Sequence, residues 1–243
     1  MHDVGIYENL ILGIHFLLLK KCKIFDEKTI VRCYTGRSMR INVRKHERRG
    51  YQSIKMSNIL EKQFLKQRND FEKSCVERDK KYHFPQGVIF ETDIAYAKDK
   101  NKAHRLDRYR PKGKEAQILP VIINVHGGGL LLGNKEFNKY FCALLSKKGF
   151  LVYSMEYRLI PDCTFFDQLR DIFLAMDFVK EHAAADGGDL SHVYLVGDSG
   201  GACLATYANA IQNSKKIAKA AGIKPSELKA VSYTHLRAHE TEA

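Results

Sequence analysis

The sequence predicts an α/β protein built on a mostly parallel sheet that is flanked by helices. Three short apolar runs, residues 119–125, 150–155 and 192–196, alternate with longer segments whose apolar residues recur every three or four positions. Apolar runs of this length are typical of strands buried on both faces, and their alternation with helices is typical of parallel sheets. A glycine-rich turn follows the first and the third run, which predicts functional groups at the carboxyl edge of the sheet.

The elements of this core are bounded by ordinary signals. Gly149 follows the first helical segment, where glycine commonly ends a helix. In the second helical segment, five large apolar side chains fall at spacings that share one face. The expected order is strand Leu119–Val125, helix Phe137–Lys148, strand Phe150–Met155, helix Phe166–Ala184, strand His192–Val196 and helix Ala202–Gln212.

The segment before this core has a different composition and hydrophobic pattern. Residues 7–81 show helical spacing, few glycines and many long charged side chains, and the first proline is Pro85. An extended run then begins at residues 88–90 and continues at residues 94–97, and a polar turn at residues 99–101 is consistent with a hairpin. We therefore expect an N-terminal helical arm over residues 1–85 and an α/β body over residues 86–229.

Composition limits the remaining possibilities. The chain has 243 residues, 44% of them hydrophobic and 28% charged, which suits one globular domain with an appendage. Six cysteines occur without CxxC pairs, so we expect reduced thiols and a cytoplasmic protein. The apolar run 11–19 is too short to span a bilayer and follows acidic residues, unlike a signal peptide. Nothing in the motifs predicts a metal ion or another cofactor.

The positive charge of the chain is concentrated in its N-terminal half. The formal net charge is +12, and residues 1–115 carry all of this excess. A basic arm could meet acidic lipid or nucleic acid. We interpret it instead as the solvated face of helices, because no nucleic-acid-binding motif accompanies the charge.

A serine in a tight turn is the first candidate for chemistry. Gly197-Asp198-Ser199-Gly200-Gly201 fits G-x-S-x-G, with a strand before it and a helix after it. A serine in this turn has a strained backbone, so small residues are needed two positions to either side. The letters GDSGG also surround the serine of chymotrypsin-like proteases, but those are antiparallel barrels. The strand-to-helix context favours Ser199 as the nucleophile of an acyl-transfer enzyme.

A glycine loop supplies the second signal. His126-Gly127-Gly128-Gly129 follows the strand Leu119–Val125 directly and lies 73 residues before the serine. Three glycines allow the backbone N–H groups to converge on one oxygen atom. We expect the oxyanion hole to consist of the N–H groups of Gly127, Gly128 and Gly200, and we expect His126 to be structural.

These motifs together resemble the hormone-sensitive-lipase-like esterases, the α/β hydrolase fold-3 family. The resemblance covers about residues 87–210. It rests on HGGGLLLG at residues 126–133, YRLIPD at residues 157–162, residues 166–171 and GDSGG at residues 197–201. Family members usually have YRLAPE and GDSAGG, so Asp162 stands for a Glu and Gly200 for an Ala. The resemblance implies an α/β-hydrolase fold, a small-molecule acyl ester as substrate, and an N-terminal helical cap over the acyl pocket.

The last residues of the chain do not fit this pattern. A serine nucleophile needs a histidine base held by a carboxylate, and His235 and His239 are the histidines that follow Ser199. Both lie in the stretch 231–241, which resembles the translation of a transposase-adapter sequence used in sequencing libraries. We interpret residues 230–243 as a non-native tail. The expected fold is therefore incomplete at its C-terminus, with the sheet cut beside the strand His192–Val196 and the triad Asp and His absent.

The sequence leaves several functions open. The leading hypothesis is a serine carboxylic ester hydrolase. An amidase or peptidase could use the same site, because the fold does not fix the leaving group. A ligand-binding relative that has lost catalysis is a third possibility. The sequence predicts neither the acyl-chain length nor the oligomeric state.

Overall fold

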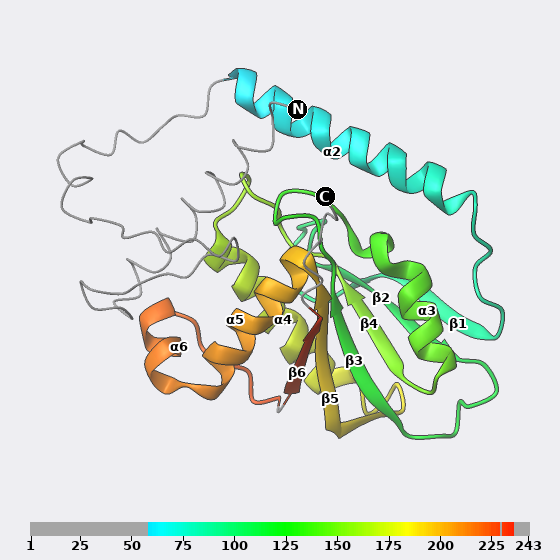
Figure 1. Ribbon diagram of the computed structural model, residues 1–243. Helices are drawn as coiled ribbons and strands as arrows, with labels where there is room; N and C mark the ends of the chain where they lie inside the picture. The colour runs from blue at the N-terminus through cyan, green and yellow to red at the C-terminus, as the bar shows by residue number, and fades with distance from the viewer. Residues whose placement is uncertain (1–57, 229, 236–243) are drawn as a thin grey trace, which may run out of the picture.

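The computed structural model describes residues 58–228 and the backbone of residues 230–235. Within these residues the chain forms one six-stranded sheet in the order β1-β2-β4-β3-β5-β6 (Figure 1). The strands are β1 (Val88–Ala95), β2 (Arg105–Pro111), β3 (Leu119–Val125), β4 (Leu151–Met155), β5 (Gly188–Asp198) and β6 (Ala230–His235). The helices are α2 (Asn58–Asp79), η2 (Lys135–Asn138), α3 (Lys139–Lys147), α4 (Phe165–His182), α5 (Ser199–Asn213) and α6 (Lys215–Ala221).

The sheet has an antiparallel and a parallel part. Strand β1 pairs antiparallel with β2, and β2 pairs antiparallel with β4. Strands β4, β3, β5 and β6 run parallel to one another. The parallel part confirms the predicted strand and helix alternation. Because β3, β5 and their following turns end at the same edge, the register brings Val125 opposite Gly197.

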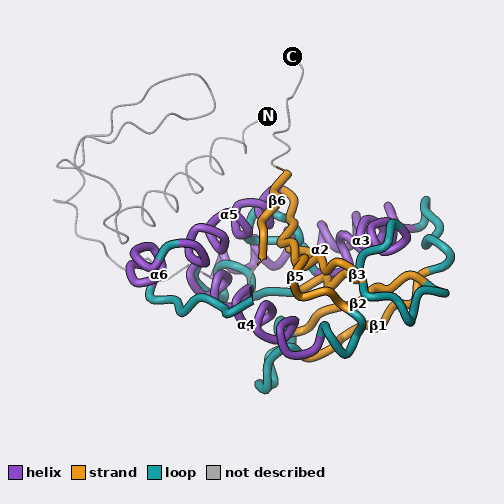
Figure 2. The backbone as a smooth tube through the Cα atoms, turned by 90° about the horizontal axis from the view of Figure 1, so that it is seen from below, coloured by secondary structure: helices purple, strands orange, loops and turns teal. Residues whose placement is uncertain are grey.

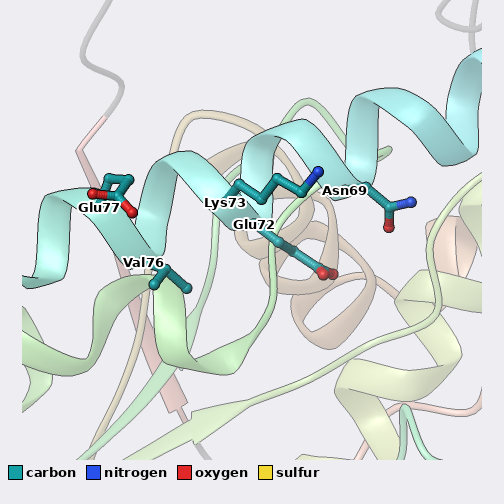
Figure 3. A pocket seen from close by; sticks show the side chains of 5 residues that line it. All are labelled: Asn69, Glu72, Lys73, Val76 and Glu77. Carbon is teal, nitrogen blue, oxygen red and sulfur yellow. The ribbon is translucent and has the colours of Figure 1, made fainter.

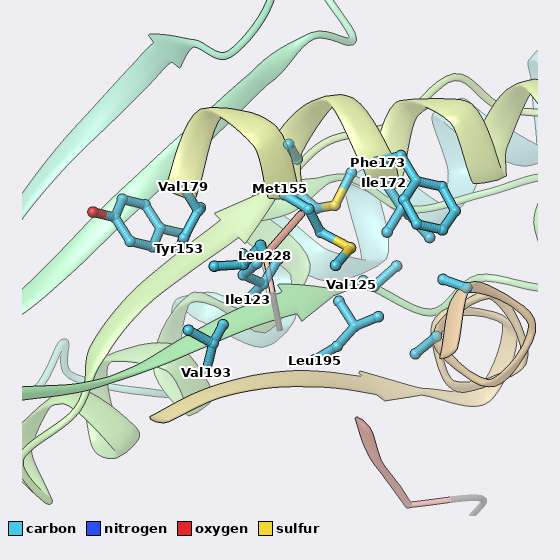
Figure 4. Packing of buried hydrophobic residues seen from close by; sticks show 14 of the residues in the cluster. Ile123, Val125, Tyr153, Met155, Ile172, Phe173, Val179, Val193, Leu195 and Leu228 are labelled. Atoms are coloured by element: carbon cyan, nitrogen blue, oxygen red, sulfur yellow. The ribbon is translucent and has the colours of Figure 1, made fainter. Parts of the chain in front are cut away.

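Helices cover both faces of the sheet, as predicted. Alternate residues of β3 enter different cores: Val121, Ile123 and Val125 face the larger one, whereas Ile122 faces the smaller. The larger core is packed by α4 and α5, and its centre is drawn in Figure 4. The smaller core is packed by α3 through Cys142 and Ala143. Helices α3 and α4 therefore lie on opposite sides of the strands (Figure 2).

Some elements differ from the prediction. Strand β3 has the predicted bounds, but β5 is longer at both ends, since it runs from Gly188 to Asp198. The first predicted helix is divided into η2 and α3. Strand β2 was not predicted, because Asp107 and Arg108 separate its buried Leu106 and Tyr109 and lower its apolar content. The turn after β1 leads into this strand, so the expected hairpin forms between β1 and β2.

The sheet extends beyond β5, contrary to the prediction. We expected the sheet to end at the strand His192–Val196, yet β6 pairs in parallel with β5 from Val193 to Asp198. Strand β6 consists of residues that we interpreted as foreign. Its sequence, AVSYTH, contains Val, Tyr and Thr, which favour extended structure beside an open strand edge.

The N-terminal region is described only in part. Residues 1–57, most of the predicted helical arm, lie outside the described residues. Helix α2 confirms helical structure near the end of that arm, and the chain leaves it before β1, where the sequence changes texture. Among the described helices, none is both long and apolar enough to cross a membrane.

Candidate active site

Ser199 lies at a sharp turn between β5 and α5. It is the first residue of the helix and has a φ of 46°, a left-handed conformation that side-chain-bearing residues rarely adopt. The glycines two positions away are required by packing. A Cβ at Gly197 would lie 2.5 Å from the carbonyl carbon of Gly201, and one at Gly201 would lie 2.1 Å from the Val125 oxygen. The turn therefore has the strained geometry that the G-x-S-x-G pattern predicted.

The glycine loop after β3 lies against this turn. Gly128 and Gly129 have φ values of 119° and 63°, so both use conformations that favour glycine. A Cβ on Gly200 would lie 3.0 Å from the nitrogen atoms of Gly129 and Leu130. The residue after the serine is thus in direct contact with the backbone N–H groups of the loop. An alanine here, as in GDSAGG, would be a tight fit.

Asp198 joins the two turns. Its contacts contradict the prediction that the Gly127 N–H belongs to the oxyanion hole. Its Oδ1 accepts hydrogen bonds from the Gly127 N–H at 3.0 Å and from the Asn138 side chain at 2.7 Å. The Gly127 N–H therefore already has an acceptor within the protein. The N–H groups of Gly128 and Gly129 donate no hydrogen bond within the part of the chain that the structure describes. They replace Gly127 as candidate donors beside Gly200.

The same carboxylate explains why the start of α5 is open. Asp198 is the N-cap residue of α5, a position where Asp usually accepts from the first helical N–H groups. Here its side chain makes no capping hydrogen bond, because it is turned toward the loop. The N–H groups of Gly200 and Gly201 are therefore left at the positive end of the helix. Such an end stabilises a negative charge placed next to it.

His126 makes contacts of a kind that a structural role would need. Its ring is fully buried and stacks on Tyr157 with ring centroids 4.3 Å apart. Its Nδ1 donates to the Gly127 carbonyl at 2.8 Å, and its Nε2 lies 3.0 Å from a Glu156 carboxylate oxygen. The Tyr157 hydroxyl donates to the His126 carbonyl, and burial raises the pKa of that hydroxyl. Both ring nitrogens are occupied, so this imidazole holds the loop and takes no proton from Ser199.

Polar side chains at the ends of β3 and β4 support the loop from below. Asn124 is fully buried and donates to the Ser154 hydroxyl at 3.1 Å, and that hydroxyl donates to the Lys135 carbonyl. Glu156 accepts from the Lys135 N–H at 3.0 Å. These bonds fix the segment that carries Asn138 and, through it, the carboxylate of Asp198. Sequence reasoning missed this network because single Asn and Ser residues within apolar strands have no distinctive spacing.

The YRLIPD segment holds the far end of the loop. Leu130 has a φ of 72°, unusual for a residue with a side chain. Its carbonyl accepts from the Ile160 N–H at 3.0 Å and from the Gln168 side chain at 2.9 Å. Gln168, itself buried, also donates to the Arg158 carbonyl. The motif thus positions the loop, which explains physically why YRLIPD and HGGG occur together.

No described histidine contacts Ser199. The nearest by sequence, His192, is bonded to Asp189 and Ser191 at the other end of β5. His104 lies between the carboxylates of Asp99 and Asp171. By register, the backbone of His235 in β6 lies opposite Asp198, one residue before Ser199.

Helix α2 borders a hollow in the described part of the structure. This hollow is lined by Asn69, Glu72, Lys73, Val76 and Glu77, all from that one helix (Figure 3). None of these belongs to the serine turn or the glycine loop. Within residues 58–228, no group of three His, Cys, Asp or Glu side chains is placed to hold a metal ion.

A strained serine between a parallel strand and a helix, facing a glycine loop after a neighbouring strand, defines the α/β-hydrolase class. The BD-FAE family description matches residues 106–234, more than half of the chain. The chain belongs to the BD-FAE family.

Known relatives of the chain are esterases. Isoprenylcysteine alpha-carbonyl methylesterase of Arabidopsis thaliana is 32% identical over 114 residues, 47% of this chain. Versiconal hemiacetal acetate esterase of Dothistroma septosporum is 30% identical over 112 residues. The crystal structure of esterase B from Lactobacillus rhamnosis matches with a TM-score of 0.65 at 28% identity, covering 72% of this chain. These findings confirm the predicted fold and the resemblance to hormone-sensitive-lipase-like esterases.

The matches cover only part of those proteins. They span 26% of the Arabidopsis relative, 32% of the Dothistroma relative and 57% of the esterase B chain. The activity of the whole protein is therefore a matter for proposal.

Proposed function

We propose that the protein is a serine carboxylic ester hydrolase that acts through an acyl-enzyme on Ser199. The observation that carries this proposal is the contact between the serine turn and the glycine loop, where Gly200 meets the N–H groups of Gly129 and Leu130. The esterase relatives support an ester as the bond that is cleaved. The substrate is a small-molecule acyl ester, and no cofactor takes part.

The proposed chemistry has two steps. The Ser199 Oγ attacks the acyl carbonyl carbon, its proton passes to a histidine base, and the carbonyl oxygen becomes negative. The N–H groups of Gly128, Gly129 and Gly200 stabilise this oxygen, together with the positive end of α5. The alcohol leaves with the proton. Water then attacks the acyl-enzyme, releases the carboxylic acid and restores Ser199.

The base is the part of the mechanism that no described side chain supplies. One candidate is a histidine that lies outside the described residues. The alternative is His235, whose backbone lies beside the turn. The experiment must therefore compare the protein expressed from its native gene with the 243-residue chain.

The test is hydrolysis of p-nitrophenyl acetate and butyrate by both proteins, with Ser199→Ala as the variant. Removing a catalytic serine leaves only the residual rate from binding and the oxyanion hole, so we expect a loss of more than about 1000-fold. Ser191→Ala, which removes an exposed hydroxyl at the other end of β5, is the matched control and should keep full activity. A fluorophosphonate should label Ser199, as read by mass spectrometry.

Each alternative has its own outcome. Ester hydrolysis that survives Ser199→Ala would refute the proposal. Faster cleavage of p-nitroanilides than of the matched esters would indicate an amidase. Binding of esters without turnover or labelling would indicate a non-catalytic relative. Activity of the 243-residue chain that is lost on His235→Ala would identify that residue as the base and overturn the interpretation of residues 230–243.

A further inference from the structure

Arg68 connects helix α2 to both loops that shape the candidate site. Its Nε donates to the Leu131 carbonyl at 3.0 Å, one Nη donates to the Ile160 carbonyl at 2.8 Å, and the other lies 2.7 Å from Asp162. Leu131 belongs to the glycine loop after β3, whereas Ile160 and Asp162 belong to the YRLIPD segment after β4. We call these three interactions the Arg68 clamp.

The acceptors of the clamp are close to the candidate oxyanion donors. Leu131 lies two residues after Gly129, and the N–H groups of Leu131 and Leu132 both bond to the Gly128 carbonyl, at 3.2 and 2.9 Å. This turn gives Gly128 its positive φ. A displacement of the Leu131 carbonyl would therefore also displace Gly128 and Gly129, because one hydrogen-bonded turn joins these residues.

The two carbonyl contacts of the Arg68 clamp are expected to contribute more interaction energy than its ion pair with Asp162. The Asp162 side chain is 66% exposed, and ion pairs with such groups contribute about 0–1 kcal/mol. The Arg68 side chain is only 16% exposed, and its bonds to carbonyl oxygens are charge-assisted, which makes them stronger than neutral ones. The two carbonyl contacts therefore hold the loops, and the carboxylate orients the guanidinium.

Helix α2 has other attachments that do not touch the glycine loop. Phe71 packs on Phe137 with ring centroids 5.2 Å apart, Arg78 donates to the Phe137 carbonyl at 3.1 Å, and Asp79 pairs with Lys139 at 2.6 Å. These contacts fix the C-terminal half of α2 to η2 and α3. Loss of Arg68 therefore leaves the helix attached while it releases the loops.

We propose that Arg68 is a positioning residue for ester hydrolysis, because it holds the oxyanion loop through the carbonyls of Leu131 and Ile160. This inference rests on the proposed function of the site. Oxyanion donors act only over a narrow range of distances, and a shift of about 1 Å far from the chemistry can cost roughly 100-fold in rate. Because the negative oxygen exists only in the transition state, the loss falls on kcat and leaves KM nearly unchanged.

The test uses the protein expressed from its native gene and four variants. Arg68→Ala should lower kcat for p-nitrophenyl butyrate by about 10–100-fold with KM within about 2-fold. Arg68→Lys reaches one acceptor as a point charge and should fall between wild type and Arg68→Ala. Asp162→Asn should lose less than about 3-fold. Arg78→Ala removes an arginine from the same helix that touches Phe137 instead of the loop, and it is the matched control with wild-type kcat.

Hydrogen exchange supplies a readout that needs no activity. The amides of Leu131 and Leu132 are protected by their bonds to Gly128, and Arg68→Ala should speed their exchange at least tenfold, whereas Arg78→Ala should not. An Arg68→Ala kcat within 2-fold of wild type, or an equal loss in Arg78→Ala, overturns the inference. If wild type shows no Ser199-dependent hydrolysis, the proposed function fails, and unchanged exchange in Arg68→Ala then overturns the clamp independently.

Discussion

The two glycine-rich turns of the site are held by different forces. At the serine turn, glycine is required by backbone packing, since a Cβ at Gly197 or Gly201 would overlap main-chain atoms. At the loop after β3 the steric limits differ from glycine to glycine: a Cβ on Gly128 would lie 2.1 Å from the Leu132 carbonyl oxygen, within the loop itself, whereas a Cβ on Gly129 meets nothing within 4 Å. Side chains from distant segments, among them Asp198, Gln168 and Arg68, attach this loop to the rest of the protein.

Because of this difference, we expect the serine turn to be rigid and the loop after β3 to be adjustable. Packing against main-chain atoms cannot relax without moving β3 or α5, so the proposed nucleophile, Ser199, has a fixed position. Hydrogen bonds from side chains can be weakened one at a time. The position of the serine is therefore set by the core, whereas the position of the candidate oxyanion donors also depends on a small number of polar contacts.

The largest effect is expected from Gly201→Ala. Its Cβ would lie 2.1 Å from the Val125 oxygen and 2.5 Å from the His126 oxygen, and neither can move aside. We expect a loss of about 3 kcal/mol or more in the free energy of unfolding, measured by urea denaturation. Gly129→Ala, with open space but a φ of 63°, should lose only about 1–2 kcal/mol. Equal losses in both variants would contradict the difference between the turns.

Asp198 is the contact through which the two turns meet, so its variants sharpen the comparison. Asp198→Ala frees the Gly127 N–H and the Asn138 side chain, and we expect kcat to fall about 10–100-fold through loss of donor geometry. Asp198→Asn keeps the Oδ1 atom that accepts both bonds in the structure. It should retain kcat within about 3-fold. Steady-state ester hydrolysis measures both, and a wild-type kcat in Asp198→Ala would show that the loop keeps its place without this carboxylate.

A smaller effect is expected at the start of α4, which carries Gln168 to the loop. Thr164 and Asp167 form a capping box there. Bonds from the Thr164 hydroxyl lower the pKa of Asp167 below its ordinary value, so this carboxylate stabilises the fold above the unfolded pKa of about 3.9. That contribution is lost as the pH falls through the lower, folded pKa.

Asp167→Asn should therefore destabilise the protein by about 1 kcal/mol at pH 7, and the difference from wild type should narrow as the pH falls below about 4. Urea unfolding at pH 7, 5 and 3 measures this. Glu181→Gln, at the other end of α4 and outside the capping box, is the control. A difference that stayed constant across this pH range would exclude the ionised capping box as its cause.

Prediction from sequence succeeded where the determinants are local. Strand β3 is a continuous apolar run, and the serine turn is specified by five adjacent residues whose small size is a steric requirement. The elements that sequence reasoning missed depend on distant partners. Strand β2 alternates with arginines that bond to the segment around Asp186 and residues 114–117, and Arg68 is one cation among many in a basic region. The Gly127 N–H was misassigned because its partner, Asp198, is 71 residues away.

The missing cap of α5 also has a consequence for engineering. Helix N-caps are a common source of added stability, and natural proteins often give up such stability at functional sites. Asp198 has the residue type for a cap, but its carboxylate is committed elsewhere. A change that turned this carboxylate back onto α5 would stabilise the helix and occupy N–H groups that the proposed mechanism assigns to the substrate oxygen. Selection for thermal stability at this turn is therefore expected to lower the turnover rate.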